Sequence, residues 1–172
     1  RTDLINELTE KHNRAGVTDQ TVVEIHVDSS FRYPFAGGRP QFVNSGTLRK
    51  LNGPGTTTIA NLILANSGTI DIQKGRIDIQ SATGFLAGNA SIAQDASLTY
   101  SSSSFTNTEI ATFTGPGSAS YASGTLWLGG AVQPPGLILA GGSARLLPTF
   151  QAGSITNLVL QGMQLDGSNQ LC

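Results

Sequence analysis

Apolar and polar residues alternate in short runs over most of the chain. Residues 69–73 and 76–80 lie on either side of Lys74-Gly75, and each run holds two isoleucines at alternate positions. A period of two is that of a β-strand. It directs one set of side chains into a core, Ile70, Ile72, Ile77 and Ile79, and another toward solvent, Asp71, Gln73, Asp78 and Gln80. Similar runs at 91–93, 97–100, 126–128, 137–139 and 158–160 predict an all-β chain of short strands joined by tight turns.

The alternating pattern also repeats. Asn44-Ser45-Gly46-Thr47-Leu48 returns as Asn66-Ser67-Gly68-Thr69-Ile70, and a relaxed copy stands at 122–126. Residues 59–64 are echoed at 155–160 and in part at 136–139. Repeats of short strands predict coils that stack and bury their apolar faces against one another. The expected fold is a parallel β-helix, or β-solenoid, of about five to seven rungs with roughly 20 to 25 residues each.

The spacing of the repeat assigns a register. A shift of about 22 residues places Leu48 on Ile70 and Arg49 on Asp71. Stacked strands lie about 4.8 Å apart, so Arg49 and Asp71 should form an exposed ion pair worth well under about 1 kcal/mol.

The same shift stacks Asn44 on Asn66 at a corner, where their amides can hydrogen-bond as an asparagine ladder. By analogy, Asn61 and Asn157 should occupy one equivalent corner in distant rungs. The two Gly-Pro-Gly segments, at 53–55 and 115–117, do not fit a constant period, so corner loops should differ in length.

The first part of the chain has a different composition. Leu4, Ile5 and Leu8 recur at helical spacing and predict an amphipathic helix over 3–14 that caps the first rung, a recognition helix being the alternative. Residues 21–27 predict a half-buried strand with Val23, Ile25 and Val27 inward. The aromatic residues of the following loop, Phe31, Tyr33 and Phe35, should plug the end of the core or bind a partner. We divide the chain into a cap or junction segment, 1–39, and a solenoid, 40–172.

Charge and composition limit the partners. The formal net charge is −1, which gives no electrostatic footprint for nucleic acid or an anionic membrane. No apolar run reaches the roughly 18 residues of a membrane span, so no membrane insertion is expected. Twenty-one glycines and 12% charged residues favour an extracellular β-rich protein. The start at Arg1, without an initiator Met or signal peptide, suggests a segment of something longer.

Few residues offer catalytic or metal-binding chemistry. The two histidines are His12 and His26, and the single cysteine is Cys172, either incidental or bridged to a partner. We expect no metal, no cofactor and no catalytic residues. The catalytic alternative is a carboxylate site for carbohydrate cleavage at Asp71 and Asp78, helped by Lys74 and Arg76; the simpler interpretation is that all four are solvated.

Two further positions suit binding or modification. Trp127 lies between inward Leu126 and Leu128, so it should either stack on a sugar ring or pack under a loop. Asp71 and Asp78 are the other candidate glycan contacts. Asn89-Ala90-Ser91 fits the N-glycosylation pattern, which matters for a secreted eukaryotic protein.

Three segments carry a resemblance to a known group: 42–50, 53–59 and 66–70. Over about residues 40–172 the chain resembles the imperfect Gly-, Thr- and Asn-rich repeats of large extracellular β-helix proteins, especially bacterial adhesins, filamentous haemagglutinin-like proteins and autotransporter passengers. The resemblance implies a right-handed parallel β-helix outside the cell that acts as a non-catalytic adhesin stalk or fibre building block. Its expected partners are further copies, end to end, or a glycan or cell-surface receptor. The alternative is a carbohydrate-binding or carbohydrate-cleaving β-helix.

Overall fold

The computed structural model describes residues 22–33, 38–107, 111–129, 136–149 and 159–166, which form nineteen β-strands in three sheets. Sheet A contains β1 (Val22–Ile25), β4 (Thr47–Lys50), β7 (Thr69–Ile72), β10 (Gly88–Ile92) and β13 (Ala111–Thr114). Sheet B contains β2 (Ser30–Arg32), β5 (Thr56–Ala60), β8 (Arg76–Gln80), β11 (Ser97–Ser101), β14 (Ser118–Tyr121), β16 (Leu137–Leu139) and β18 (Val159–Leu160). Sheet C contains β3 (Gln41–Asn44), β6 (Ile63–Asn66), β9 (Thr83–Phe85), β12 (Ser103–Asn107), β15 (Gly124–Leu128), β17 (Ser143–Leu146) and β19 (Gln164–Asp166).

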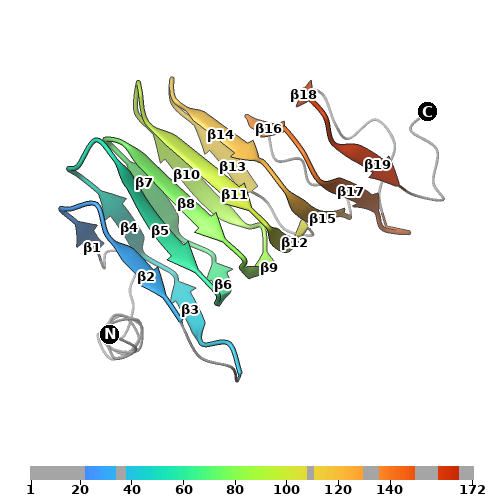
Figure 1. The fold of residues 1–172 in the computed structure, drawn as a ribbon, viewed down its shortest axis with the longest axis horizontal. Coiled ribbons are helices and arrows are strands. Elements are labelled where there is room, and N and C mark those ends of the chain that lie inside the picture. The colour runs from blue at the N-terminus through green and yellow to red at the C-terminus, as the bar shows by residue number, and fades with distance from the viewer. Residues whose placement is uncertain (1–21, 34–37, 108–110, 130–135, 150–158, 167–172) are drawn as a thin grey trace.

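The three sheets wind into a β-solenoid of about six turns. Every strand pairs in parallel with a strand one turn earlier or later. From β1 to β15 successive strands visit sheets A, B and C in order, and the described strands β16 to β19 alternate between sheets B and C. Figure 1 shows the strands stacked along the long axis, with the first and last described strands at opposite ends. The prediction of an all-β parallel solenoid is therefore confirmed.

The register follows the repeat where the repeat is regular. Leu48 pairs with Ile70 and Arg49 with Asp71, as the shift of about 22 residues predicted. Farther along sheet A the number of residues per turn changes. Thr69 pairs with Asn89, a shift of 20 residues, and Asn89 pairs with Thr112, a shift of 23 residues. On sheet C, 125 pairs with 143, a shift of 18. The corners absorb these differences, as the spacing of the two Gly-Pro-Gly segments indicated.

Two sequence echoes do not mark equivalent places. The segments at 44–48 and 66–70 join sheet C to sheet A, whereas 122–126 joins β14 of sheet B to β15 of sheet C. Ile63 follows Asn61 into sheet C, but Val159, two residues after Asn157, lies in sheet B. The strands that follow the two echoed segments thus lie in different sheets, and Asn157 itself lies outside the described residues. Different corners favour similar residues because each needs small or turn-forming residues before a strand.

The corner between sheets B and C bends through a left-handed residue on successive turns. Asn61, Ser81 and Ser102 have φ of 60°, 51° and 50°, a region that is uncommon for residues other than glycine. The backbone N–H of Asn61 donates to Gln80 O at 3.1 Å and that of Ser81 to Ser101 O at 2.9 Å. Hydrogen bonds between turns therefore hold the bends at Asn61 and Ser81.

The inward side chains fill a continuous core. Ile70, Ile72, Ile77 and Ile79 are all buried, as the alternation predicted. The middle of the core is aromatic: the rings of Tyr100 and Tyr121 stack at 5.9 Å, and that of Phe105 meets Tyr100 edge-on at 5.3 Å. Burial raises the pKa of both tyrosines well above that of a free phenol. Phe105 pairs with Gly84, so the ring lies where the neighbouring turn has no side chain.

The solenoid reaches closer to the N-terminus than the proposed boundary at residue 40. Strands β1 and β2, within the segment 1–39, are the first strands of sheets A and B. Phe31 packs against the core, but Val27 follows the end of β1 and is 64% exposed, so its inward assignment is wrong. The expected helix over 3–14 and Phe35 lie outside the described residues.

Candidate functional surfaces

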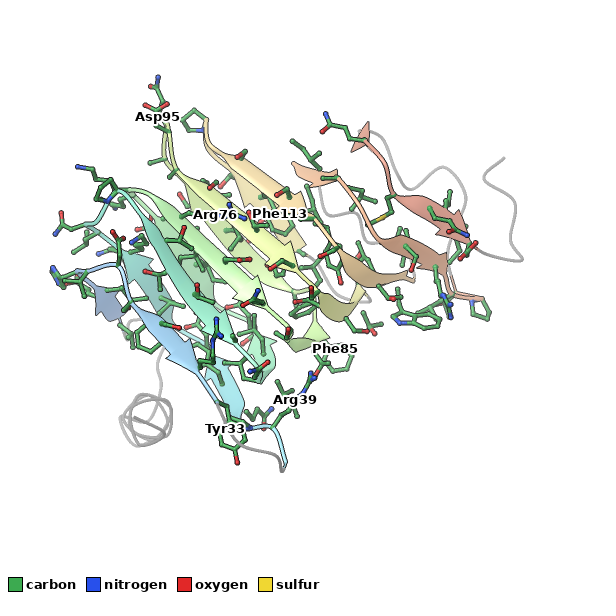
Figure 2. The ribbon with its side chains drawn as sticks, viewed as in Figure 1. Tyr33, Arg39, Arg76, Phe85, Asp95 and Phe113 are labelled. Atoms are coloured by element: carbon green, nitrogen blue, oxygen red, sulfur yellow. The ribbon has the colours of Figure 1, made fainter. Side chains whose placement is uncertain are left out.

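Figure 2 shows side chains projecting from the strands. The parallel register places the outward residues of successive turns in columns along each sheet. The faces differ in chemistry because the outward residues differ. Sheet A carries a column of charged residues, Glu24, Arg49 and Asp71. Sheet B carries Arg76 and Asp78 on the single strand β8, where each pairs with uncharged residues of the neighbouring turns. The outward positions of sheet C are aliphatic, aromatic, amide or hydroxyl residues from β3 through β15. One solenoid therefore offers three distinct surfaces.

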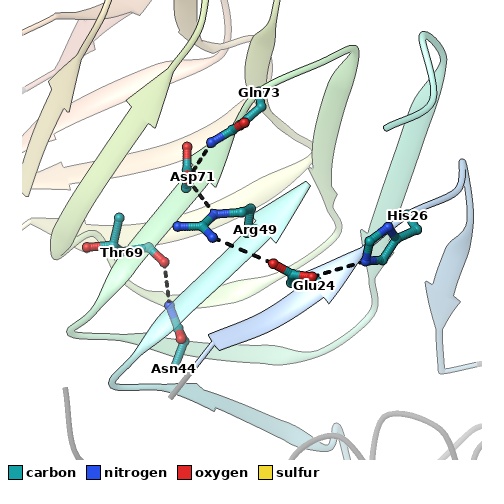
Figure 3. A network of polar contacts seen from close by, with 7 residues as sticks. All are labelled: Glu24, His26, Asn44, Arg49, Thr69, Asp71 and Gln73. Carbon is teal, nitrogen blue, oxygen red and sulfur yellow. Dashed lines mark hydrogen bonds and ion pairs between the residues drawn. The ribbon is translucent and has the colours of Figure 1, made fainter. Parts of the chain in front are cut away.

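A chain of ion pairs and hydrogen bonds crosses the first turns of sheet A (Figure 3). Arg49 Nε donates to Asp71 Oδ2 at 2.7 Å, and its Nη1 lies 3.6 Å from Glu24 Oε1. The hydrogen bond to the Asp71 carboxylate is the main cause that raises the pKa of Arg49. Gln73 donates to Asp71 at 3.2 Å, and His26 lies 3.1 Å from Glu24. The predicted ion pair of Arg49 and Asp71 is confirmed, although it is partly buried, within a network that links three turns.

The asparagine pair lies just inside the corner between sheets C and A. Asn44 Nδ2 donates to Asn66 Oδ1 at 2.6 Å and to Thr69 O at 3.1 Å, and both side chains are buried. Asn66 Nδ2 continues to Ala87 O at 2.9 Å. Each amide thus donates toward the next turn, and the Oδ1 of Asn44, in the first described strand of sheet C, has no partner among the described residues. The ladder has a direction, and its accepting end faces the N-terminus.

The two candidate carboxylates point to different faces. Asp71 lies on sheet A beside Arg49, whereas Asp78 lies on sheet B and accepts a hydrogen bond from Ser101 Oγ at 2.7 Å. Lys74 lies between β7 and β8, at the corner, and Arg76 is exposed on sheet B. A glycosidase pair must flank one bond from about 5 to 10 Å apart. The fold does not bring Asp71 and Asp78 to one substrate.

Trp127 stands on sheet C, away from both aspartates. It is partly exposed between the buried Leu126 and Leu128, and the guanidinium of Arg145 lies 5.1 Å from its ring centroid. Phe85, in the same outward column, is 54% exposed, and Figure 2 shows it projecting from the ribbon. Sequence reasoning missed Phe85 because the neighbouring inward position is Gly84. Glycine has no apolar side chain, so the alternation that identifies a strand is interrupted there.

The glycosylation candidate Asn89 is exposed on β10 of sheet A. The hydroxyl of Thr112, one turn later, donates to its Oδ1. The side-chain nitrogen that a glycan would occupy is on the solvent face of a strand. The position is therefore accessible.

An ion pair between a buried lysine and an exposed aspartate near the first turns is a feature that sequence reasoning missed. Lys50 is fully buried, and its Nζ donates to Asp28 Oδ1 at 2.7 Å, Asn52 O at 3.1 Å and Thr57 Oγ1 at 3.2 Å. The hydrogen bond from Lys50 is the main cause that holds the pKa of Asp28 below its ordinary value. Asp28 and Lys50 are 22 residues apart, so the same shift that found Arg49 and Asp71 was the available signal.

An apolar cavity of about 290 Å³ opens at the N-terminal end of the core, lined by Val23, Ile25, Phe31, Phe42, Leu48 and Ile59, among others. Ser29 also lines it, and the buried Oγ of this residue has no hydrogen-bond partner among the described residues. The core is thus less completely filled at its first turn than in its middle.

Within the described ranges, no group of three or more His, Cys, Asp or Glu is arranged to hold a metal ion, and no helix could span a membrane. His12 and Cys172 lie outside those ranges. No protein-family model, curated protein or solved structure matches this chain.

Proposed function

We propose that this chain is a non-catalytic structural segment of a large extracellular surface or filament protein, serving as an adhesin stalk or fibre building block. The observation that carries the proposal is the uninterrupted stack of parallel sheets, in which two of three faces continue over seven strands. Seven strands at about 4.8 Å span roughly 29 Å along the axis. A stack of this kind resists bending because each turn is hydrogen-bonded to both neighbours.

The composition supports a place outside the cell. Only 12% of residues are charged, and glycine is abundant, as suits a secreted β-rich surface. The separation of Asp71 and Asp78 on different sheets favours a structural role over carbohydrate cleavage. The test is immunogold labelling of the source cells with an antibody against the purified chain. Labelling of intact cells is expected, and labelling only after permeabilisation would overturn the extracellular assignment.

The ends of the stack support a second part of the proposal. Strands β1, β2 and β3 have no described neighbour before them, and edge strands present unpaired backbone groups. We propose that the N-terminal segment forms a helical cap over 3–14 and covers this end. The cap would close the cavity and lie over the unpartnered Asn44 Oδ1. The coil is proposed to be right-handed, the hand that parallel crossovers prefer.

End-to-end contact between copies is the competing use of the same end, and it would make the chain a fibre subunit. Negative-stain micrographs of the purified chain separate the two. Isolated short rods support a capped stalk segment, whereas long regular fibres mean that the first turn pairs with the last turn of another copy.

A further inference from the structure

The outer face of sheet C differs from the other two faces in what it exposes. Four large hydrophobic residues of the described chain are exposed. Val22 begins β1 and Val27 lies in the loop after it, whereas Ile63 and Phe85, at 38% and 54%, both lie on sheet C. Their neighbours in the sheet, Val43 and Ala65, are partly exposed and also apolar. Exposed apolar residues that adjoin one another, unlike ones that are scattered singly, are a feature of interaction sites.

Two columns run along this face parallel to the solenoid axis. The aromatic column contains Val43, Ala65, Phe85, Thr106 and Trp127. The hydroxyl column beside it contains Thr83, Ser104, Thr125 and Ser143 on successive turns. The two columns are two residues apart along each strand, or about 6.7 Å. Aromatic and hydroxyl groups are therefore interleaved over several turns.

The spacing of the two rings is set by the fold. Phe85 pairs with Thr106, and Thr106 pairs with Trp127, so the backbone positions that carry the two rings are two turns apart, or about 9.6 Å. This distance is close to the length of a disaccharide unit in an extended β-linked glycan. In such a chain every second sugar presents the same ring face, so both aromatic side chains can meet equivalent faces of one chain.

The charge of the face selects among ligands. The outward positions from β3 through β15 carry no charged residue, and charge first appears at Arg145 and Asp166 in the last two described turns. An anionic polymer would find no column of cations on this part of the face. The hydroxyl residues would pair with the hydroxyl groups of a neutral ligand.

We propose that the outer face of sheet C binds a neutral, extended polysaccharide, whose sugar rings stack on Phe85 and Trp127 and whose hydroxyl groups contact the column of Thr83, Ser104 and Thr125. Arg145 lies over the indole of Trp127 at 5.1 Å, so its guanidinium has to move aside for a sugar to stack on that face of the ring. Asp71 and Asp78 take no part because they lie on other sheets. The proposal goes beyond the structural role and does not depend on it.

Trp127 is the single tryptophan of the chain, so intrinsic fluorescence reports on the proposed site directly. The purified chain is titrated with cellohexaose, chitohexaose and mannohexaose, and with oligogalacturonate as the charged comparison. We expect a saturable change in fluorescence with at least one neutral hexasaccharide and none with oligogalacturonate.

The variant that tests the site is Phe85→Ala, because it leaves the reporter in place. Loss of one stacking ring should raise the Kd about tenfold. The matched control is Val22→Ala, which shortens a 44%-exposed apolar residue on sheet A and should leave the Kd unchanged. Circular dichroism establishes that both variants are folded.

Three results would overturn the proposal. One is the absence of any fluorescence change with the neutral oligosaccharides. Another is a Kd that Phe85→Ala does not alter. The third is light scattering that shows a dimer dissociated by Phe85→Ala, since the face would then be covered by a second copy of the chain.

Discussion

The amide pair of Asn44 and Asn66 should contribute a measurable coupling free energy to the fold. Asn66→Ala removes the acceptor 2.6 Å from Asn44 Nδ2 and the donor 2.9 Å from Ala87 O. Each bond contributes roughly 0.5–1.5 kcal/mol net, and a buried group left without a partner costs roughly 1–3 kcal/mol. We therefore expect Asn66→Ala to lower the free energy of unfolding by about 2–4 kcal/mol.

A double-mutant cycle separates the shared bond from the other effects. Asn44→Ala, Asn66→Ala and the double variant are compared by urea unfolding, followed by circular dichroism. The double variant should be more stable than the sum of the single changes predicts, with a coupling of about 1 kcal/mol.

The control cycle uses Thr47→Ala and Thr69→Ala. These two residues pair in register on sheet A, three positions after the asparagines, but face outward and are only partly buried. Their coupling should stay below about 0.3 kcal/mol. An asparagine coupling no larger than that of the threonines would refute the view that the amides hold adjacent turns together. A changed urea dependence would instead reveal that the turns no longer unfold as one unit.

Two further predictions concern the backbone and pH. Gly84→Ala should lower the free energy of unfolding by more than about 3 kcal/mol, because φ of Gly84 is +149° and a Cβ would lie 2.0 Å from Leu64 O. The control is Gly38→Ala, where nothing lies within 4 Å of the added carbon. It should change the free energy of unfolding by less than about 0.5 kcal/mol. Thermal unfolding of both variants checks this, and similar melting temperatures would contradict it. Asp28 has a pKa below its ordinary 3.8 because Lys50 donates to it. Its contribution to stability is therefore present above pH 3.8 and is lost as pH falls through the lowered value. The advantage in urea midpoint of the natural chain over Asp28→Asn should be constant near neutrality and disappear in acid. An advantage that persisted below the lowered pKa would exclude the ion pair as its cause.

Much of the fold could be predicted because its periodicities are local. Alternation at Ile70 and Ile72 identifies the inward face of one strand, and the repeat places Arg49 beside Asp71 without knowledge of the corner geometry. The ladder of Asn44 and Asn66 was accessible for the same reason. The echo at 122–126 misled because corners of different sheets select similar residues, and a short motif does not say which corner it occupies.

The candidate surface was less predictable. Trp127 was visible as an outward aromatic residue between two leucines, but Asp71 and Asp78 were grouped with it although the solenoid directs them to other faces. Phe85 gave no signal, since Gly84 beside it interrupts the alternation. Residues on the two sides of a corner are near in sequence, yet the corner turns the chain onto another sheet.

By itself, the sequence determined that the chain is a stack of short parallel strands with an aliphatic core, since period-two burial and a repeating length are properties of neighbouring residues. Only the tertiary structure decided which outward residues share a face, that Lys50 is buried against Asp28, and that Phe85 and Trp127 stand in one column. The physical reason is that a column joins residues one full turn apart, and the length of each turn depends on how its corners pack.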